Sequence, residues 1–429
     1  MSDSMAIMRR TQDMTNRKKQ VYAWAMIDWA NSSFAIVVMT AFFPAMFKQV
    51  WARDLSAIDS TFMLSLFNSA SSLAIALLAP ILGSIADQGN AKKRFLTVFT
   101  LLGVLASGLL PMAGEGQYML AGCLYALGAL GFSGNNTFYD ALITDVSEAR
   151  DFDRVSALGY SLGYLGGGLL FMVNLLMVSQ PERFGLSGKG QAVDFAFIMT
   201  AAWWAIFTIP ALLWIHETPA VPAVGGGGSV LTRGFKQLAE TFREIKQLKQ
   251  VVLYLAAYML YIDAVNTVIK MAVDYGLSIG LQDKDLMTAL LLTQFIGFPA
   301  AILFGRLGER WGAKAGITLA ILVYMGICGF AYRMTTSREF FVMALVVGLV
   351  QGGIQSLSRS YFARLIPAER SGEFFGFYNM LGKFAAVIGP TLMGVTAKLT
   401  GNSRMSILSL LLLFGTGLSL LFKVKETRA

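Results

Sequence analysis

Residues 83–94 read GSIADQGNAKKR, and residues 305–314 read GRLGERWGAK. Each stretch joins two long apolar segments and holds a glycine, an acidic residue four positions later, and nearby basic residues. The second copy follows the first by about half the length of the chain, which indicates two related halves. Tandem halves inside a membrane are typical of secondary transporters, whose substrate site lies between the halves. The repeated loop therefore predicts a duplicated membrane protein with one central site.

The composition supports a membrane location. The chain has 429 residues, of which 55% are hydrophobic and 14% are charged, whereas about a quarter of the residues in a soluble domain are charged. A helix needs roughly 20 apolar residues to cross a bilayer. We expect an all-α integral membrane protein with twelve transmembrane helices in two pseudo-symmetric six-helix bundles. The expected spans lie near 21–49, 61–86, 95–113, 118–142, 155–179, 193–216, 250–275, 285–305, 315–334, 339–363, 372–397 and 403–423.

The basic residues gather on one side of this topology. Most of the 35 lysines and arginines fall in loops on the same side as the N-terminus. Because cytoplasmic loops carry the excess of Lys and Arg, we expect both termini in the cytoplasm. The net charge of +9 then reflects topology, and no nucleic-acid partner is expected. The compact loops favour a multi-pass protein of a bacterial inner (plasma) membrane.

One polar segment divides the spans six and six. It predicts an N-terminal bundle at 1–216, a cytoplasmic linker at 217–249 and a C-terminal bundle at 250–429. The linker contains the run GGGGS, which is flexible. Residues 231–250 then place apolar residues at helical spacing beside basic ones. This pattern favours an amphipathic helix on the inner membrane surface, and a solvated tether is the alternative.

Polar residues form stripes along several expected spans. A charge at mid-bilayer is costly, so each one needs a partner or a function. Asp28 and Asn31 share a helix face, and the motif recurs as Asp263 and Asn266 in the second half. We expect the stripes to face a hydrated cavity that binds a substrate or a proton. The candidate residues are Asp28, Asn31, Asn135, Asn136, Tyr139, Asp140, Asp263, Asn266, Lys270, Gln351, Gln355, Arg359 and Lys383.

This mixture of charges favours a zwitterionic solute. The aspartates could bind a cationic group or a proton, and Arg359 suits a two-pronged grip on a carboxylate. The alternative is that the charges pair with one another and lock the helices together. The repetition of the loop favours a function for it, and the alternative is ordinary helix capping, for example by Asp87 at the start of the next helix. Its candidate residues are Gly83, Asp87, Lys92, Lys93 and Arg94 in the first copy and Gly305, Glu309 and Arg310 in the second.

Rival enzyme signals are weak. The run GFSG at 131–134 resembles an intramembrane serine-protease motif, but a nucleophile needs a base within reach. The single histidine, His216, falls at the inner end of the sixth span, far in depth from Ser133. The two cysteines, Cys123 and Cys328, lie inside apolar spans, without the spacing of metal ligands. We expect no enzyme, no metal and no cofactor; an intramembrane hydrolase is a remote alternative.

Four longer runs resemble one known family. They are DWANSSFAIVVMTAFFP (28–44), GFSGNNTFYDALITDVS (131–147), RVSALGYSLGYLGGG (154–168) and QSLSRSYFARLIPAERSGEFFGFYNMLGKFAAVIGP (355–390). Together they are similar to the vacuole-effluxer-like branch of the major facilitator superfamily, named for a fungal vacuolar amino-acid exporter linked to autophagy. The resemblance implies two rocking six-helix bundles, a path lined by spans 1, 4, 7 and 10, and inner gating loops at Asp87 and Glu309. It also suggests amino-acid export.

The expected function is therefore secondary active transport. We expect a small polar solute, an amino acid or a similar zwitterion, to cross the bilayer by alternating access, with proton coupling left open. An exporter of drugs or other metabolites is the alternative, and an importer of sugars ranks third. The expected partners are a small-molecule substrate, the lipid bilayer and, if transport is coupled, protons. The protein is expected to be a monomer.

Overall fold

The computed structural model describes residues 2–218, 230–244, 248–278, 282–385 and 387–425. Within these ranges it does not describe the side chains of residues 2–14, 230–231, 233–235, 242, 244, 270–278, 283–284, 385 and 403. Every regular element in the described ranges is a helix. The long helices of the first half are α1 (Ser2–Ser33), α3 (Ala57–Gly89), α4 (Lys92–Leu109), α5 (Tyr118–Ala141), α7 (Phe152–Ser179) and α8 (Lys189–Trp214). Those of the second half are α10 (Lys249–Ser278), α11 (Asp283–Trp311), α12 (Ala313–Arg333), α13 (Ser337–Leu365), α14 (Ser371–Ala385), α15 (Ile388–Thr400) and α16 (Ser403–Lys423).

The multi-span helical fold is confirmed. Eleven helical segments of the described residues are long and apolar enough to cross a membrane. The remaining expected span is α5, which has 24 residues and thus the length that a crossing needs. Its hydropathy is lowered by polar residues such as Asn135 and Asn136, which lie in its second half.

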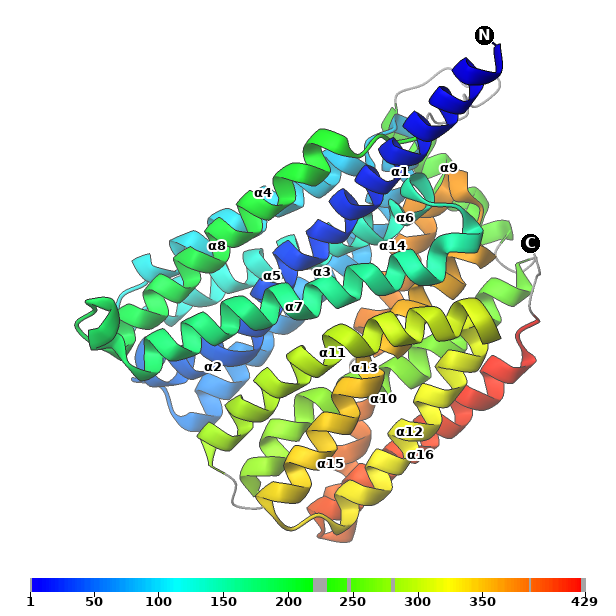
Figure 1. Cartoon of the computed structure of the whole chain (residues 1–429). Helices are drawn as coiled ribbons and strands as arrows, with labels where there is room; N and C mark the ends of the chain where they lie inside the picture. Colours follow the sequence, from blue (N-terminus) through cyan, green and yellow to red (C-terminus); the bar gives the residue numbers. More distant parts are fainter. Residues whose placement is uncertain (1, 219–229, 245–247, 279–281, 386, 426–429) are drawn as a thin grey trace.

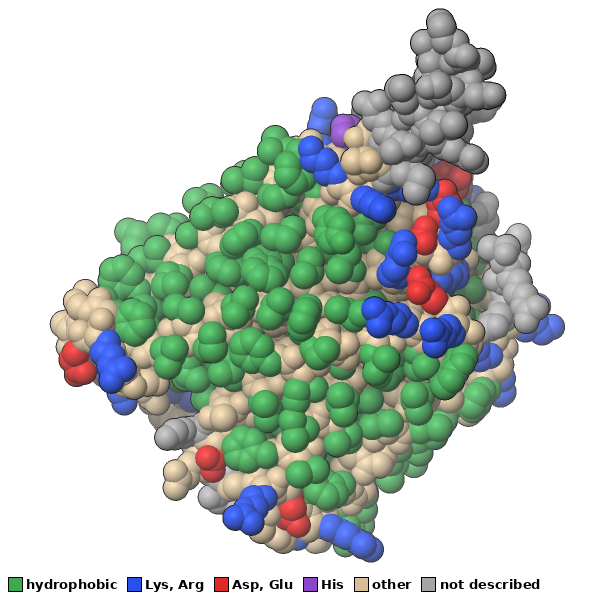
Figure 2. Space-filling view, in the orientation of Figure 1, with side chains coloured by type: hydrophobic (Ala, Val, Ile, Leu, Met, Phe, Trp, Pro, Cys, Tyr) green, Lys and Arg blue, Asp and Glu red, His purple; other side chains and the backbone are tan. Residues whose placement is uncertain are grey.

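The helices form two groups that converge toward one face. Figure 1 shows α1–α8 on the upper left and most of α10–α16 on the lower right; α14 lies higher, near α6 and behind α7, and both chain termini are on the same side. We call that side the terminal face and the opposite side the distal face. On the surface seen in Figure 2, hydrophobic side chains cover the middle of the helices, while Lys and Arg gather toward the terminal face. This distribution suits a bilayer around the middle of the helices.

Glycines allow the two groups to meet closely near the terminal face. Gly83 of α3 has no room for a side chain, because a Cβ there would collide with the backbone of Gly372 at the start of α14. On the other side of the interface, a Cβ at Gly305 of α11 would lie 2.5 Å from the Cβ of Ala157 on α7. We call these contacts the α3–α14 seam and the α7–α11 seam. Small residues permit such close helix packing in membranes.

Two expected spans are not single α-helices. The first span continues beyond α1 as π-helix η1 (Phe34–Phe42), α2 (Phe43–Met46) and π-helix η2 (Phe47–Trp51). The eleventh span, expected as one helix over 372–397, ends α14 at Ala385 and begins α15 at Ile388. Pro390 then stands in the first turn of α15, where its missing N–H costs no helical hydrogen bond. Composition predicts the apolar stretches but not these interruptions.

The described part of the predicted linker contains one helix, α9 (Val230–Glu244). It packs against α3. Gln237 and Thr241 are both buried on its protein-facing side. The proposed contact of this helix with a membrane surface stays a prediction, whereas its contact with the bundle is observed. The run GGGGS that precedes it lies outside the described residues.

Candidate functional site

Arg359 joins the two helix groups. It lies on α13, and its side chain reaches α5 and α7, where the residue is 1% exposed. Nη1 donates to Oδ1 of Asp140 at 3.0 Å, Nε donates to Oγ of Ser156 at 2.8 Å, and Nη2 donates to the Ser156 carbonyl at 2.9 Å. All three nitrogens of the guanidinium therefore donate hydrogen bonds to the N-terminal half. Removing Arg359 would leave the carboxylate of Asp140 buried beside an empty space.

Three aromatic rings enclose the same guanidinium. The Cζ atom of Arg359 lies 4.4 Å from the ring centre of Tyr160 and 4.8 Å from those of Trp24 and Tyr139. Cations within about 6 Å of an aromatic face are attracted to it. Trp24 also stacks on Tyr139 at 4.4 Å and donates its Nε1–H to the Tyr139 carbonyl at 2.8 Å. The rings are thus fixed to one another as well as to the cation.

Asp28 completes the negative side of this arrangement. Its Oδ2 accepts a hydrogen bond from the Tyr139 hydroxyl at 3.2 Å, and its Oδ1 accepts one from Ser32 at 3.0 Å. The second oxygen of Asp140 accepts a hydrogen bond from Asn379 of α14 at 3.1 Å. Two carboxylates and one guanidinium therefore meet between the halves. We call the five residues on the N-terminal side the cage: Trp24, Asp28, Tyr139, Asp140 and Tyr160.

The next layer toward the distal face is uncharged. Asn31 of α1 donates to the side-chain oxygens of Asn135 at 2.8 Å and Asn136 at 2.7 Å. Between the halves, the Tyr164 hydroxyl donates to Oε1 of Gln355 at 3.2 Å. These two residues each lie one turn beyond Tyr160 and Arg359, so they cover the cage on its distal side. The asparagine stripe therefore binds within one half, and Gln355 bridges the two.

The remaining candidates of the second half lie in other surroundings. Asp263 is fully buried on α10 and accepts a hydrogen bond from the backbone N–H of Gly389 at 2.6 Å. It thereby supports the first turn of α15 after the break in the eleventh span. Asn266 is half-buried one turn further along α10, and Lys383 is half-buried one turn beyond Asn379 on α14. The side chain of Lys270 lies outside the described residues.

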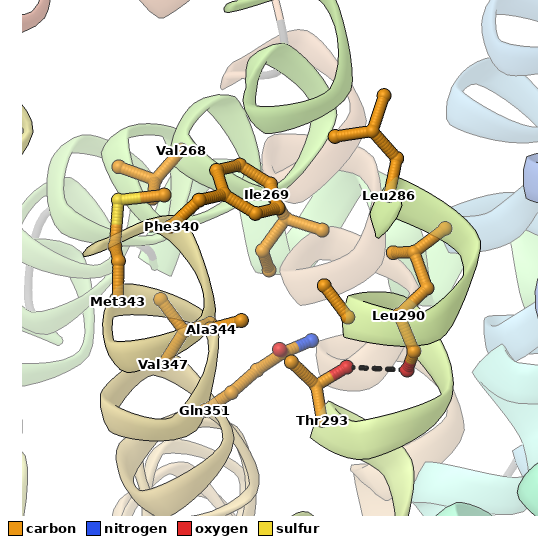
Figure 3. Close-up of a pocket in the computed structure, with 11 residues that line it drawn as sticks. Val268, Ile269, Leu286, Leu290, Thr293, Phe340, Met343, Ala344, Val347 and Gln351 are labelled. Atoms are coloured by element: carbon orange, nitrogen blue, oxygen red, sulfur yellow. Dashed lines mark hydrogen bonds between the residues drawn. The ribbon is translucent and has the colours of Figure 1, made fainter. Parts of the chain in front are cut away.

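Gln351 lines a small void within the second half. The void has a volume of about 50 Å³ and lies between α10, α11 and α13 (Figure 3). Gln351 and Thr293 are its polar residues, and Thr293 uses its hydroxyl to donate to the Leu290 carbonyl at 2.7 Å. The volume suits one or two water molecules and is far below the roughly 300 Å³ of a small ligand pocket. Its other lining residues are Val268, Ile269, Leu286, Ala289, Leu290, Phe340, Met343, Ala344 and Val347.

The first copy of the repeated loop closes the α3–α14 seam. Asp87 lies in the last turn of α3, and its carboxylate accepts hydrogen bonds from the backbone N–H groups of Gly372 at 3.0 Å and Glu373 at 2.8 Å. A negative charge is favourable at the N-terminus of a helix, here that of α14. Nζ of Lys92 lies 3.8 Å from Asp87 and donates to the Ser371 hydroxyl at 2.8 Å. The acid and the first lysine of the loop therefore both reach the other half.

The second copy does not repeat this arrangement. Glu309 has a side chain that is 35% exposed, and its carboxylate lies 3.9 Å from Nε of Arg154 on α7. A stronger ion pair lies deeper in the same region, where Nη1 of Arg364 donates to Asp153 at 2.8 Å. The two loops are similar in sequence, but only the first caps a helix of the opposite half.

The other basic residues of the loops lie at the periphery. Nζ of Lys93 donates to the carbonyls of Leu212 and Ile215 at the end of α8, so it holds together helices of the first half. Arg94 and Arg310 are exposed. Also at the terminal face, a hydrogen bond from Arg17 lowers the pKa of Glu148, which lies in the connection between α6 (Ile143–Val146) and α7. That carboxylate therefore stays charged among the basic residues.

The linker helix also takes part in the α3–α14 seam. Gln88 donates to the side-chain oxygen of Gln237 on α9, and Gln237 donates to Oε2 of Glu373 at 2.7 Å. Gln88 lies in the last turn of α3 and Glu373 in the first turn of α14, so α9 bridges the two halves beside Asp87. We call this connection the strap: Gln88, Gln237 and Glu373.

Sequence reasoning missed three members of the site. Trp24, Ser156 and Tyr160 contact Arg359, but aromatic and small polar residues are common in apolar helices and do not stand out there. The sequence held one usable signal. Trp24 precedes Asp28 by four residues, so an aromatic residue shares a helix face with an intramembrane acid. Ser156 likewise shares a helix face with Tyr160, but that pair holds no charge.

Gly159 supplies the space in which the cage forms. A Cβ at this position would collide with the Tyr139 hydroxyl and would lie 3.0 Å from Cζ3 of Trp24 and 3.1 Å from Nη2 of Arg359. We expect Gly159→Ala to displace these groups and to destabilise the protein by about 1–3 kcal/mol, as overpacking usually does. The measurement is the melting temperature of the purified protein.

A matched glycine provides the control for this change. Gly326 also lies inside a helix, α12, and a Cβ there meets nothing within 4 Å. Gly326→Ala is expected to keep or slightly raise the melting temperature, because alanine is the better helix former. Equal effects of the two substitutions would show that the cage does not constrain Gly159.

Comparisons with known proteins agree with this architecture. A family model described as vacuole effluxer Atg22 like matches residues 55–147 and 144–429. An uncharacterized MFS-type transporter of Bacillus subtilis, YxiO, is 39% identical over 411 residues, which cover 95% of each chain. Autophagy-related protein 22 of Yarrowia lipolytica is 28% identical over 306 residues. That match covers 64% of this chain and about half, 51%, of the yeast relative.

Solved structures show the same fold at low sequence identity. The proton:xylose symporter XylE, of the major facilitator superfamily, gives a TM-score of 0.74 at 12% identity, over 96% of this chain and 97% of its own. The human organic anion transporter MFSD10 gives a TM-score of 0.71 at 13% identity, over 94% of this chain and 99% of its own. At such identities the likeness concerns the fold alone.

Proposed function

The chain belongs to the vacuole effluxer Atg22-like family of major facilitator superfamily transporters, and from that premise we propose that it carries a small zwitterion, an amino acid or a close analogue. It is a multi-pass membrane protein and a secondary transporter, not an enzyme. The observation that supports the substrate class is the cluster of Arg359, Asp140 and Asp28 at the meeting surface of the halves.

The cluster is suited to a solute that carries both charges. Arg359 comes from one half, and Asp140 and Asp28 come from the other. Arg359 pairs directly with Asp140, and Asp28 joins the cluster through Tyr139, so the charges compensate one another only while the halves touch. A buried charge without a partner is strongly unfavourable. When the halves separate at the terminal face, the carboxylates need a cation and Arg359 needs an anion. An ammonium group and a carboxylate group on one small molecule supply both.

We also propose an orientation for the protein. The terminal face would lie in the cytoplasm, because cytoplasmic loops are enriched in Lys and Arg, and the membrane would be the bacterial plasma membrane. The segments 1–216 and 250–429 would move as two bodies joined by the linker at 217–249. In this orientation the contacts of Asp87, Lys92 and Arg364 form the cytoplasmic barrier. The second loop, with Glu309, would contribute little to it.

A counterflow screen tests the proposed substrate class. The purified protein in liposomes is loaded with one unlabelled amino acid at a time, and accumulation of the labelled form is followed. We expect at least one amino acid to accumulate well above protein-free liposomes. A flat result across all of them would exclude the amino-acid proposal.

Proton coupling is tested in the same vesicles. If an aspartate carries the coupled proton, a pH gradient changes the rate of uptake in the unaltered protein. The response is then lost in Asp28→Asn, Asp140→Asn or Asp263→Asn. Uptake that ignores the gradient, together with full rates in these variants, would rule out coupling through these residues.

A further inference from the structure

The cage is built by the N-terminal half alone. Trp24 and Asp28 lie on α1, Tyr139 and Asp140 lie on α5, and Tyr160 lies on α7. The stack of Trp24 on Tyr139, the hydrogen bond between them and the bond from Tyr139 to Asp28 do not involve Arg359. These contacts therefore persist when the halves separate. The cage does not need its present occupant in order to keep its shape.

The occupant comes from the other half. Arg359 is carried by α13, and only its side chain enters the cage. Any motion that separates α13 from α5 and α7 at the terminal face withdraws the guanidinium. It leaves two carboxylates and three aromatic rings around the vacated space. Aromatic faces combined with carboxylates are the composition that proteins use to bind organic cations.

We propose that the cage is a binding site for the guanidinium or primary ammonium group of a solute, and that Arg359 is its internal occupant while the terminal face is closed. This inference rests on the proposed transport function and specifies how the cationic part of the solute is bound. Arg359 and the solute cation compete for one position, so the solute binds the open conformation and not the closed one. A ligand that binds one of two conformations shifts the population toward it.

The competition between Arg359 and the solute also determines the face from which the solute reaches the cage. In the structure described, the cage is filled and covered by the Tyr164–Gln355 contact on the distal side. It becomes free only when the contacts of Asp87, Lys92 and Arg364 at the terminal face break. Solute cations therefore load from the terminal face, and closure of that face returns Arg359 to the cage and displaces them. Release on the distal side, which is export, then requires the Tyr164–Gln355 contact to open.

A small cation that imitates the arginine side chain tests the site. Methylguanidinium has the donors needed to replace the contacts of Arg359 with Asp140 and Ser156. In purified Arg359→Ala protein, we expect it to raise the melting temperature with saturating concentration dependence, by about 2 °C or more. N-methylurea has nearly the same shape without the charge and is expected to have no such effect.

Arg364 provides the matched control position. It also pairs across the halves, with Asp153 and the Ala149 carbonyl, but no cation–ring contact is found for it among the described residues. Arg364→Ala is expected not to respond to methylguanidinium. Equal responses of the two variants, or equal effects of methylguanidinium and N-methylurea, would overturn the cage proposal.

A second measurement serves if Arg359→Ala does not fold. Thr144 donates to Ser371 across the halves at 3.1 Å, so a cysteine at position 144 reports opening of the terminal face. In otherwise unaltered protein with Cys123 and Cys328 replaced by serine, methylguanidinium is expected to raise the maleimide labelling rate of Thr144→Cys several-fold. An unchanged rate would contradict competition with Arg359.

The outcome is independent of the counterflow screen. Amino-acid counterflow without a methylguanidinium response would remove the cage and leave the proposed function intact. A methylguanidinium response without amino-acid counterflow would retain the cage and replace the zwitterion by other organic cations.

Discussion

Arg359→Met is expected to reduce counterflow of the transported solute to background, a loss of at least about 100-fold. Removing one partner of a buried ion pair costs roughly 3–5 kcal/mol, which corresponds to a shift of that size or more in a two-state equilibrium. Here the cost falls on the conformation in which the halves touch, because Asp140 and Asp28 lose their shared cation. The protein would then be unable to complete the closing step of its cycle. Counterflow and the labelling rate of Thr144→Cys measure the two consequences.

The double variant separates stability from transport. In Arg359→Met combined with Asp140→Asn, the buried pair is replaced by two neutral residues, which often restores stability. We expect the melting temperature to recover in part while counterflow stays at background. Recovery of both would show that the pair only holds the halves together and that Arg359 has no role with the solute.

Asp87→Asn is expected to open the terminal face. The carboxylate of Asp87 accepts two backbone N–H groups at the start of α14, and a charge at a helix N-terminus in such a buried site contributes up to about 2 kcal/mol. Asparagine keeps one acceptor but loses the charge. The maleimide labelling rate of Thr144→Cys should therefore rise on the order of tenfold.

The second loop provides the comparison for this prediction. Glu309 lies 3.9 Å from Arg154 in an exposed position, and exposed ion pairs contribute about 0–1 kcal/mol. Glu309→Gln is expected to change the labelling rate by less than about fivefold. Similar effects of the two substitutions would contradict the unequal roles assigned to the two copies.

Much of the fold could be predicted because it depends on local composition. Apolar segments of sufficient length fix the number and approximate position of the spans, including α5 despite its two asparagines. The start of a separate helix, α15, at Ile388 could not be predicted in this way. Its first turn donates a hydrogen bond from Gly389 to Asp263, which lies on a helix far away in sequence. Such a partner becomes known only when α10 and α15 are placed together.

The candidate site could be predicted in part. Helical spacing shows that Asp28 shares a face with Asn31, and that Gln355 shares a face with Arg359. It does not show depth across the halves, so the pairing of Arg359 with Asp140 was one of several open arrangements. Asp87 illustrates the same limit. Helix capping was the alternative explanation for this loop, and the structure shows that Asp87 caps α14, which begins in the other half.

The strap gives the link between the halves a mechanical role. Gln237 contacts both Gln88 and Glu373, and the helix that carries it is part of the only covalent connection between the halves. Separation of α3 from α14 must therefore pull this helix off at least one of its two anchors. A force applied to the linker, by tension or by a bound protein, would be transmitted directly to the contacts of Asp87 with α14. The linker would therefore influence the transport cycle itself, in addition to joining the two halves.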